Sequence, residues 1–207
     1  LQHILGYQEF MGLKFQVTPQ VLIPRQDTET LVEEALRFLH DGMHILDVCT
    51  GSGCILLSLL RYSNDCVGVG CDISGEALKV ADKNAAALGI EAEFIQSNLF
   101  ENIDGKYEII VSNPPYIASG EIPGLMEEVR EHDPLMALDG GEDGLVFYRE
   151  ITGKAGEFLY PGGMLFLEIG CRQAQAVGEY MKGAGYQDIT VCRDLAGLDR
   201  VVYGVWR

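Results

Sequence analysis

Asn113-Pro114-Pro115-Tyr116 combines residue types that suit chemistry on a planar NH2 group. The two prolines fix two backbone φ angles and remove two N–H donors, while their carbonyl oxygens remain free to accept. The Asn113 side chain adds an amide oxygen, and Tyr116 adds a flat surface. Two fixed acceptors can hold both hydrogens of an amide or an exocyclic amine, and they stabilise positive charge that develops on nitrogen. The alternative interpretation is a proline-rich turn that only ends a strand.

A second candidate site lies upstream, where an apolar run ends in glycines. Residues 45–49 predict a buried strand, and Thr50-Gly51-Ser52-Gly53 predicts a tight turn into an apolar helix. Gly51-x-Gly53 is neither the full dinucleotide motif nor a phosphate loop, so a nucleoside without pyrophosphate fits better than NAD.

Asp72 supports this interpretation of the turn. It ends the next apolar run, nineteen residues after Gly53, and an acid at the tip of the second strand is placed to bind ribose hydroxyls. The other interpretation is an N-cap for the helix that follows. Ser74 is the better candidate for that cap, which leaves Asp72 available for a ligand.

Together these segments resemble the class I S-adenosylmethionine-dependent methyltransferases, and specifically the HemK-like glutamine N5-methyltransferases that modify peptide-chain release factors. The resemblance covers essentially the whole chain. Its motifs are Ile23-Pro24-Arg25 with Thr28-Glu29, Asp47-x-x-Thr50-Gly51-Ser52-Gly53, Tyr107-x-x-Ile110-Val111-Ser112-Asn113-Pro114-Pro115-Tyr116-Ile117, Asp133-Pro134-x-x-Ala137-Leu138, Gly140-Gly141-x-Asp143-Gly144-Leu145, Pro161-Gly162-Gly163, Glu168-Ile169-Gly170 and Asp199-Arg200-Val201-Val202.

The resemblance implies roles for the residues at both candidate sites. Asn113 and the Pro114 carbonyl would hold the substrate glutamine amide, with Pro115 and Tyr116 beside it. The implied cofactor is S-adenosylmethionine, with S-adenosylhomocysteine as product. The implied cofactor contacts are Asp47 and Thr50-Gly51-Ser52-Gly53 along the methionine part, Asp72 and Ile73 at the ribose, Asn98 and Leu99 near adenine, and Asn113.

Two positions depart from the family pattern. Cys49 stands where these enzymes usually carry glycine, and Asn98 stands where many carry aspartate. Both changes are small or near-isosteric, so we expect altered cofactor affinity rather than lost binding. Arg25 has two open roles: it shapes the cofactor pocket, or it pairs with a nearby carboxylate on the surface.

Apolar strands alternate with amphipathic helices, which predicts an α/β fold with a largely parallel sheet covered on both faces. We expect a Rossmann-like class I methyltransferase fold with seven strands, preceded by a short β-hairpin at residues 9–17; the resemblance implies that the last strand inserts antiparallel. Strands are expected at 45–49, 66–71, 92–95, 108–112, 164–169, 188–192 and 201–205. Helices are expected at 28–39, 55–60, 76–88, 145–158 and 174–182, with a stop at Gly185.

We assign residues 1–20 to a hairpin and linker, and 21–207 to the methyltransferase domain. The chain opens without methionine, and the resemblance implies a small helical domain before it that helps to bind the release factor. On that basis we expect this fragment to bind cofactor but to methylate release factor weakly.

The irregular stretch 118–142 reads as a lid beside the site. Its carboxylates are individually expected to be solvated, and His132 is expected at the surface or as a helix-end partner rather than as a catalytic base. These carboxylates are Glu127, Glu128, Glu131 and Asp133.

Composition indicates one domain with a substantial core, since the 207 residues are 47% hydrophobic. None of the six cysteines forms a C-x-x-C pair, so they read as small hydrophobes in a reducing cytosol. Four scattered histidines make a metal site unexpected. No apolar stretch approaches the ~20 residues of a membrane span, and we expect a cytoplasmic protein.

Net charge separates the two strongest enzyme interpretations. Asn-Pro-Pro-Tyr also resembles the motif of methyltransferases that act on exocyclic amines of adenine or guanine, and such enzymes hold phosphates with Lys and Arg. This chain has 15 basic against 31 acidic residues, a formal charge of −16. That balance favours a protein partner over nucleic acid.

The leading hypothesis is therefore methyl transfer from S-adenosylmethionine to a glutamine side-chain nitrogen, which in the family is the glutamine of the release-factor Gly-Gly-Gln motif. Three alternatives stay open: a ribosomal-protein glutamine as substrate, a nucleic-acid exocyclic amine as substrate, and a protein that binds the cofactor without catalysis.

Overall fold

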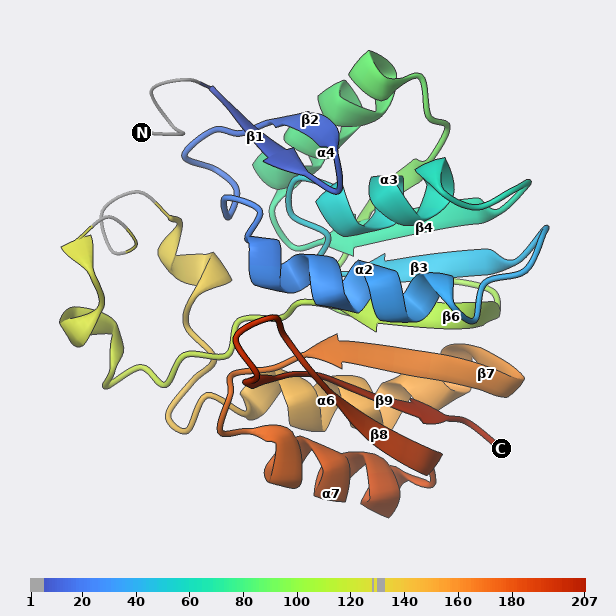
Figure 1. Cartoon of the computed structure of the whole chain (residues 1–207), viewed down its shortest axis with the longest axis vertical. Helices are drawn as coiled ribbons and strands as arrows, with labels where there is room; N and C mark the ends of the chain where they lie inside the picture. Colours follow the sequence, from blue (N-terminus) through green and yellow to red (C-terminus); the bar gives the residue numbers. More distant parts are fainter. Residues whose placement is uncertain (1–5, 128, 130–132) are drawn as a thin grey trace.

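Seven apolar runs form the central sheet of the molecule (Figure 1). The computed structural model describes residues 6–127, 129 and 133–207. The strands are β3 (His44–Val48), β4 (Val67–Asp72), β5 (Glu93–Gln96), β6 (Tyr107–Ser112), β7 (Leu159–Glu168), β8 (Gln187–Arg193) and β9 (Asp199–Val205). They lie in the order β5-β4-β3-β6-β7-β9-β8. The pairings from β5 to β7 are parallel, whereas β9 pairs antiparallel with both β7 and β8. The predicted sheet and its antiparallel insertion are confirmed.

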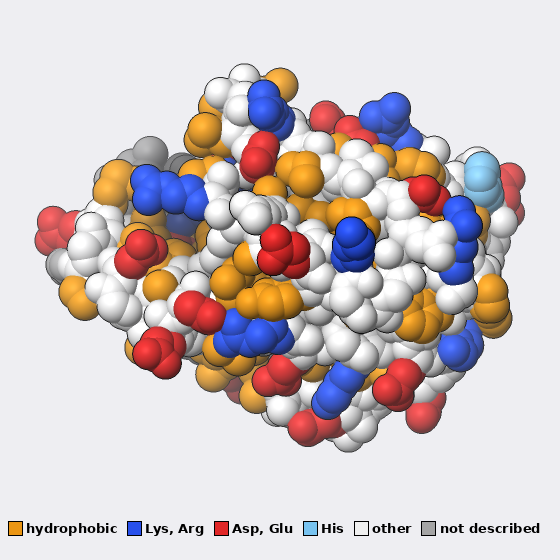
Figure 2. All heavy atoms as spheres, turned by 90° about the horizontal axis from the view of Figure 1, so that it is seen from below, with side chains coloured by type: hydrophobic (Ala, Val, Ile, Leu, Met, Phe, Trp, Pro, Cys, Tyr) orange, Lys and Arg blue, Asp and Glu red, His pale blue; other side chains and the backbone are white. Residues whose placement is uncertain are grey.

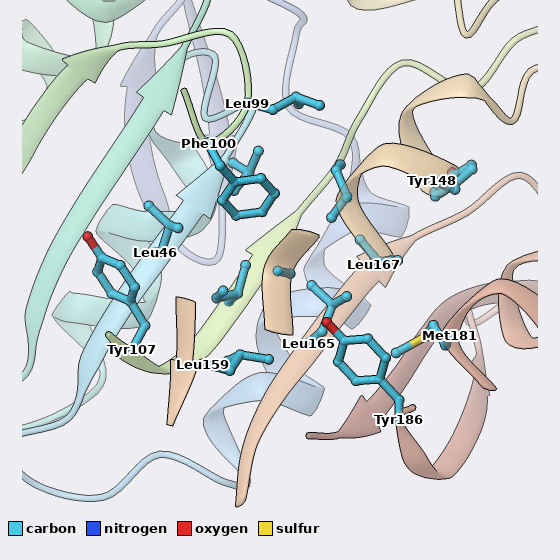
Figure 3. Packing of buried hydrophobic residues seen from close by; sticks show 14 of the residues in the cluster. Leu46, Leu99, Phe100, Tyr107, Tyr148, Leu159, Leu165, Leu167, Met181 and Tyr186 are labelled. Atoms are coloured by element: carbon cyan, nitrogen blue, oxygen red, sulfur yellow. The ribbon is translucent and has the colours of Figure 1, made fainter. Parts of the chain in front are cut away.

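Helices cover both faces of this sheet because alternate strand residues point to opposite sides. On one face, α6 (Val146–Lys154) and α7 (Ala174–Ala184) pack on Leu46, Leu165 and Leu167 (Figure 3). On the other face, α2 (Glu29–Leu36), α3 (Cys54–Arg61) and α4 (Gly75–Leu88) pack on Ile45 and Phe166. Neighbours in β3 thus belong to different cores, which places the sheet between two helical layers.

Several predicted boundaries are confirmed by local geometry. The Ser74 hydroxyl accepts from the backbone N–H of Ala77 at 3.1 Å and caps α4. Gly185 ends α7 in the left-handed region, with φ at 107°. These are the expected start and stop signals, since a short polar side chain satisfies the first free N–H groups and glycine tolerates positive φ.

Three predicted boundaries in the sheet and its helices were wrong. The helix expected at 28–39 is shorter: a 3-10 turn η1 (Gln26–Thr28) precedes α2, and α2 ends at Leu36, where the N–H groups of Arg37 and Phe38 bond three residues back. The helix expected at 145–158 changes into a 3-10 turn, η4 (Ala155–Phe158), where Gly156 packs so closely under Trp206 that a β-carbon there would lie 2.5 Å from the ring. Strand β7 begins five residues early, because Gly162 and Gly163 exchange backbone hydrogen bonds with Trp206.

The N-terminal hairpin joins β1 (Tyr7–Phe10) to β2 (Leu13–Gln16) and starts two residues before the expected bound. Met11 and Gly12 both have positive φ, which suits a tight two-residue hairpin turn. Phe15 is fully buried in the core that α2 and α3 share. Asn84 of α4 bonds to the backbone of Gln16, so the hairpin packs on the helical layer.

The stretch 118–142 contains two short 3-10 turns, η2 (Ile122–Gly124) and η3 (Leu135–Ala137), among irregular backbone. Glu128, Glu131 and His132, for which predictions were made, lie outside the described residues. Within the described part of the chain, helices long and apolar enough to span a membrane are absent.

Candidate active site

A cavity of about 320 Å³ lies at the carboxyl ends of β3, β4, β5 and β6. Ligands bind at this edge of open α/β sheets because the loops there diverge. Of the residues predicted at the two candidate sites, the cavity is lined by Thr50, Gly51, Ser52, Asp72, Ile73, Asn98, Leu99, Asn113 and Pro115. The described lining does not include Asp47, Gly53, Pro114 and Tyr116. Residues from four separate strand ends therefore meet around one space.

The glycine turn presents bare backbone to this cavity. Gly51 has φ at 55°, and a β-carbon built on it would meet no heavy atom within 4 Å. Asp47 lies beneath the turn, fully buried, and its Oδ2 accepts from the Thr50 hydroxyl at 2.6 Å. Burial raises the pKa of Asp47 to about 7. The hydrogen bond between buried Asp47 and the Thr50 hydroxyl therefore helps to fix the conformation of the turn.

Asp72 links the turn to the next strand. Its Oδ2 accepts from the backbone N–H of Gly51 at 3.0 Å, and its Oδ1 accepts from the N–H of Ser74 at 2.9 Å. Each carboxylate oxygen has a further lone pair, and the residue lines the cavity. A carboxylate in this position can accept hydrogen bonds from hydroxyl groups of a bound ligand.

The two departures from the family pattern lie in the cavity wall. Cys49 is half-buried and has φ at 62°, in the left-handed region where glycine is normally found. Asn98 donates its side-chain N–H to Glu101 Oε1 at 2.9 Å. The backbone at Cys49 thus explains why a glycine suits this position.

The Asn113–Tyr116 segment continues β6 into the cavity wall. Asn113 is half-buried, and its Nδ2 lies 3.5 Å from the Thr28 hydroxyl. Among the hydrogen bonds of the described residues, none uses the Pro114 carbonyl oxygen. The Tyr116 carbonyl accepts from Gln173 Nε2 at 2.9 Å. The segment is therefore held at its Tyr116 end, while Asn113 Oδ1 and the Pro114 carbonyl oxygen lack hydrogen-bond partners among the described residues.

Two glycines that the sequence analysis did not assign to the site hold this segment from behind. A β-carbon on Gly140 would lie 2.8 Å from the Pro115 carbonyl oxygen, and one on Gly144 would lie 2.5 Å from the Tyr116 carbonyl oxygen. A parallel bridge pairs Ile117 with Asp139. The returning loop can approach the segment this closely only without side chains.

Arg25 lines the cavity and forms an ion pair with Asp133, a carboxylate that is buried rather than on the surface. The expectation that Asp133 is solvated was wrong, because its side chain is fully buried and also accepts from the backbone N–H of Ile23 at 3.2 Å. This pair joins the residues before α2 to Pro134 and Met136, which form the opposite cavity wall.

Thr28 and Glu168 are functional candidates that the sequence analysis quoted only within motifs. Thr28 lines the cavity beside Asn113, and only 2% of its surface is exposed. Glu168 ends β7 and is equally buried, and burial raises its pKa to about 7. A signal was present in the sequence, since Glu168 is an acid at the end of a buried apolar strand.

Buried thiols near the site stay protonated. Burial raises the pKa of Cys54 and of Cys71 to about 12 and raises that of Cys49 well above its ordinary value. All six cysteines are free. In the described ranges no cluster of three or more metal-ligating side chains occurs.

The surface carries mixed charge on the face shown in Figure 2, where Lys and Arg side chains are scattered among Asp and Glu. The excess of acidic residues, 31 against 15, is therefore not offset on this face by a continuous basic patch of the kind that binds phosphates.

Comparisons with known proteins agree with this geometry. Residues 26–176 match the family model described as methyltransferase small domain. A release factor glutamine methyltransferase of Geobacter sulfurreducens is 46% identical over 205 residues, which are 99% of this chain and 72% of that protein. The enzyme of the same description from Agrobacterium fabrum is 43% identical, over 98% of this chain and 73% of that protein.

Solved structures show the same fold. A release-factor-specific protein-(glutamine-N5) methyltransferase from Alicyclobacillus acidocaldarius has a TM-score of 0.55 at 31% identity, covering 92% of this chain and 98% of that one. A T. thermophilus 16S rRNA methyltransferase in complex with AdoMet and guanosine has a TM-score of 0.71 at 18% identity, covering 97% and 50%, a likeness of fold alone. The sequence identity decides the family: the chain belongs to the release factor glutamine methyltransferases.

Proposed function

We propose that this methyltransferase transfers a methyl group from S-adenosylmethionine to the side-chain nitrogen of a glutamine in a peptide-chain release factor. One observation carries the proposal: Asn113 and Pro115 line the same cavity as the glycine turn and Asp72. Asn113, which offers one of the two proposed acceptors, thus lies at the space in which a nucleoside-type ligand fits. The names of relatives that are 46% and 43% identical supply the substrate class.

The residues present fit S-adenosylmethionine. The bare backbone of Gly51 leaves room for close approach of a ligand. The Asp72 carboxylate offers acceptors for ribose hydroxyls, and Asn98 and Leu99 lie at the same cavity. When bound, the cofactor supplies a methyl group on a sulfonium centre; the S–C bond breaks as the N–C bond forms, and its electron pair stays on sulfur.

The protein's part is to orient the nitrogen. Asn113 Oδ1 and the Pro114 carbonyl oxygen each accept one N–H of the glutamine amide, which turns the nitrogen lone pair away from its carbonyl group and toward the methyl carbon. Both acceptors also stabilise the positive charge that develops on nitrogen. Orientation of this kind can supply ~7–11 kcal/mol at its upper range.

A strong base is not required, because the amide proton leaves to solvent after the N–C bond forms. Tyr116 has a structural part in this scheme. Burial raises the pKa of its hydroxyl well above the ordinary value, so it stays a neutral phenol. A neutral phenol does not compete for the amide proton.

The test offers radiolabelled S-adenosylmethionine and the chain to purified release factor, total ribosomal protein and RNA in separate reactions, and then maps the labelled residue. We expect label on a release-factor glutamine. Label confined to a ribosomal protein or to RNA would overturn the substrate assignment while retaining the cofactor. Cofactor binding with no transfer to any of the three would overturn the proposed catalysis.

A further inference from the structure

Two segments at the cavity edge of the sheet carry exposed apolar side chains. Leu135 and Met136 of η3 are 60% and 59% exposed, and Met136 also lines the cavity. The turn between β8 and β9 (residues 194–198) carries Leu195, which is fully exposed, and Leu198, which is 48% exposed. A leucine in water contributes little to the fold, whereas a group of exposed apolar side chains marks a site where a partner binds.

The β8–β9 turn lies at the same edge of the sheet as the cavity. Strand β9 runs antiparallel to β7 with Val201 opposite Glu168, so the turn before β9 lies at the carboxyl end of β7. Figure 1 shows this turn beside the start of α2, and the Asp27–Arg200 ion pair agrees with that placement. A folded protein that places a side chain in the cavity would therefore cover this edge, and the turn with it.

The turn holds its leucines in a fixed position. The Asp194 side chain is only 2% exposed, and its Oδ1 accepts from the N–H groups of Ala196 and Leu198 at 2.9 and 3.0 Å. Its Oδ2 accepts from Arg200 Nε and Nη2 at 3.1 and 3.0 Å. Because the backbone is already ordered, burial of Leu195 by a partner costs little conformational entropy.

The element η1 joins both apolar segments to the cavity lining. Arg200 Nη2 lies 3.3 Å from Asp27 Oδ2 in η1, so the ion pair within the turn continues to that element. Arg25, directly before η1, pairs with Asp133, which lies two residues before the start of η3. The two apolar segments are thus both tied by ion pairs to the stretch of chain that lines the cavity.

The charge of this edge determines what kind of partner fits. Apart from the paired Asp133, the described residues of 118–142 include four acidic side chains and no basic one: Glu121, Glu127, Asp139 and Glu142. Figure 2 shows Asp and Glu side chains among hydrophobic ones at the end of the molecule that this stretch forms. A complementary partner presents apolar side chains among Lys and Arg, since opposite potentials favour encounter and suppress wrong partners.

We propose that Leu135, Met136, Leu195 and Leu198 form a docking surface for the protein substrate, which extends outward from the cavity mouth. This inference rests on the proposed function and gives the same release factor a second point of recognition. The docking surface binds apolar side chains of the folded release factor that lie among basic ones. It contributes affinity that a short peptide around the glutamine does not receive.

The first experiment removes one leucine from each segment. Leu135→Ser and Leu195→Ser change exposed side chains; Val67→Ser is the matched control, since Val67 is exposed at the start of β4, at the opposite edge of the sheet. Binding of release factor is titrated with S-adenosylhomocysteine present, and labelled methyl transfer gives kcat and KM. We expect each leucine variant to raise the Kd and KM for release factor about tenfold, with kcat and the Kd of S-adenosylhomocysteine within about twofold of the parent. Val67→Ser should match the parent.

The second experiment offers the same variants a short peptide that contains the substrate glutamine. The parent, Leu135→Ser and Leu195→Ser should methylate the peptide with equal kcat/KM, because the peptide does not reach the docking surface. Added salt should weaken binding of release factor to the parent, since salt screens the acidic edge.

Parent-like KM values of both leucine variants for release factor, or equal losses for release factor and peptide, would overturn the inference. A parent dimer that Leu195→Ser dissociates, with the affinity for release factor unchanged, would also overturn it, because the surface would then bind a second copy of the chain. A parent that transfers no methyl group to release factor would overturn the proposed function, and this inference with it.

Discussion

Cys49→Gly should stabilise the protein relative to Cys49→Ala. Cys49 follows β3 with φ at 62° and lines the cavity. An L-residue in the left-handed region is destabilised by roughly 1–2 kcal/mol, because its β-carbon approaches the following carbonyl oxygen. Glycine has no β-carbon and avoids that strain. Alanine removes the thiol but keeps the β-carbon. Comparing Cys49→Gly with Cys49→Ala therefore separates the effect of the β-carbon on backbone strain from the effect of losing the sulfur.

The expected difference between the two variants is about 1 kcal/mol. The relief of strain is offset in part by the greater conformational entropy of glycine in the unfolded chain, roughly 0.4–1 kcal/mol. For a domain of this size about 1 kcal/mol corresponds to a Tm difference of about 2–4 °C. Any packing lost with the thiol is common to both variants and cancels in their comparison.

The assay is urea unfolding of parent, Cys49→Gly and Cys49→Ala, followed by far-UV circular dichroism at one protein concentration. Equal m values with a higher midpoint for Cys49→Gly than for Cys49→Ala would agree with the reasoning. A Cys49→Gly variant less stable than Cys49→Ala would refute it, because the β-carbon at this φ would then be neutral or favourable.

Three further perturbations test the site and its support. Arg25→Ala leaves the buried Asp133 carboxylate without its cation. Since the Arg25 side chain is 42% exposed, we expect the free energy of unfolding to fall by about 1–2 kcal/mol, less than the ~3–5 kcal/mol for a fully buried pair. We also expect weaker binding of S-adenosylhomocysteine, measured by titration. Burial raises the pKa of Glu168 from 4.5 to about 7, so the folded state keeps a proton that the unfolded state loses, and stability falls as pH rises between these values. In Glu168→Gln, the decrease in the free energy of unfolding from pH 5 to pH 8, measured by urea unfolding, should be smaller than in the parent by about 3 kcal/mol. The same pH dependence in both proteins would contradict the assignment. Gly140→Ala places a β-carbon 2.8 Å from the backbone of the Asn-Pro-Pro-Tyr segment and should lower kcat at least tenfold. Gly120→Ala is the control in the same loop, with open space around it, and its kcat should match that of the parent. Equal kcat values for the two variants would show that the close contact is unimportant.

Much of the fold follows from local pattern. Residues 109–111 are apolar, and Asn113-Pro114-Pro115 follows one residue later, which is enough to predict a buried strand with a rigid segment at its carboxyl end. Ser74 and Gly185 act through their own backbone neighbours, so helix ends near them are readable from the sequence. Features that depend on one or two adjacent turns were therefore predictable.

The parts that were missed depend on distant partners. Asp133 is buried because Ile23 and Arg25, more than 100 residues away, meet its two carboxylate oxygens. Thr28 contacts Asn113 across 85 positions of sequence. Nothing in the residues around Asp133 or Thr28 specifies these partners, because the sheet order that joins them is a property of the whole chain.

The measurement that tests the central claim most directly is methyl transfer by Asn113→Ala. The substitution removes one of the two proposed acceptors. Label incorporation into release-factor glutamine and the Kd of S-adenosylhomocysteine would be measured together, with Asn64→Ala as control, since Asn64 bonds to exposed Asp41 away from the cavity. We predict that Asn113→Ala loses transfer by at least a hundredfold, about 2.7 kcal/mol, and keeps its cofactor affinity. Transfer at the rate of the parent would contradict the proposal that Asn113 holds the substrate amide.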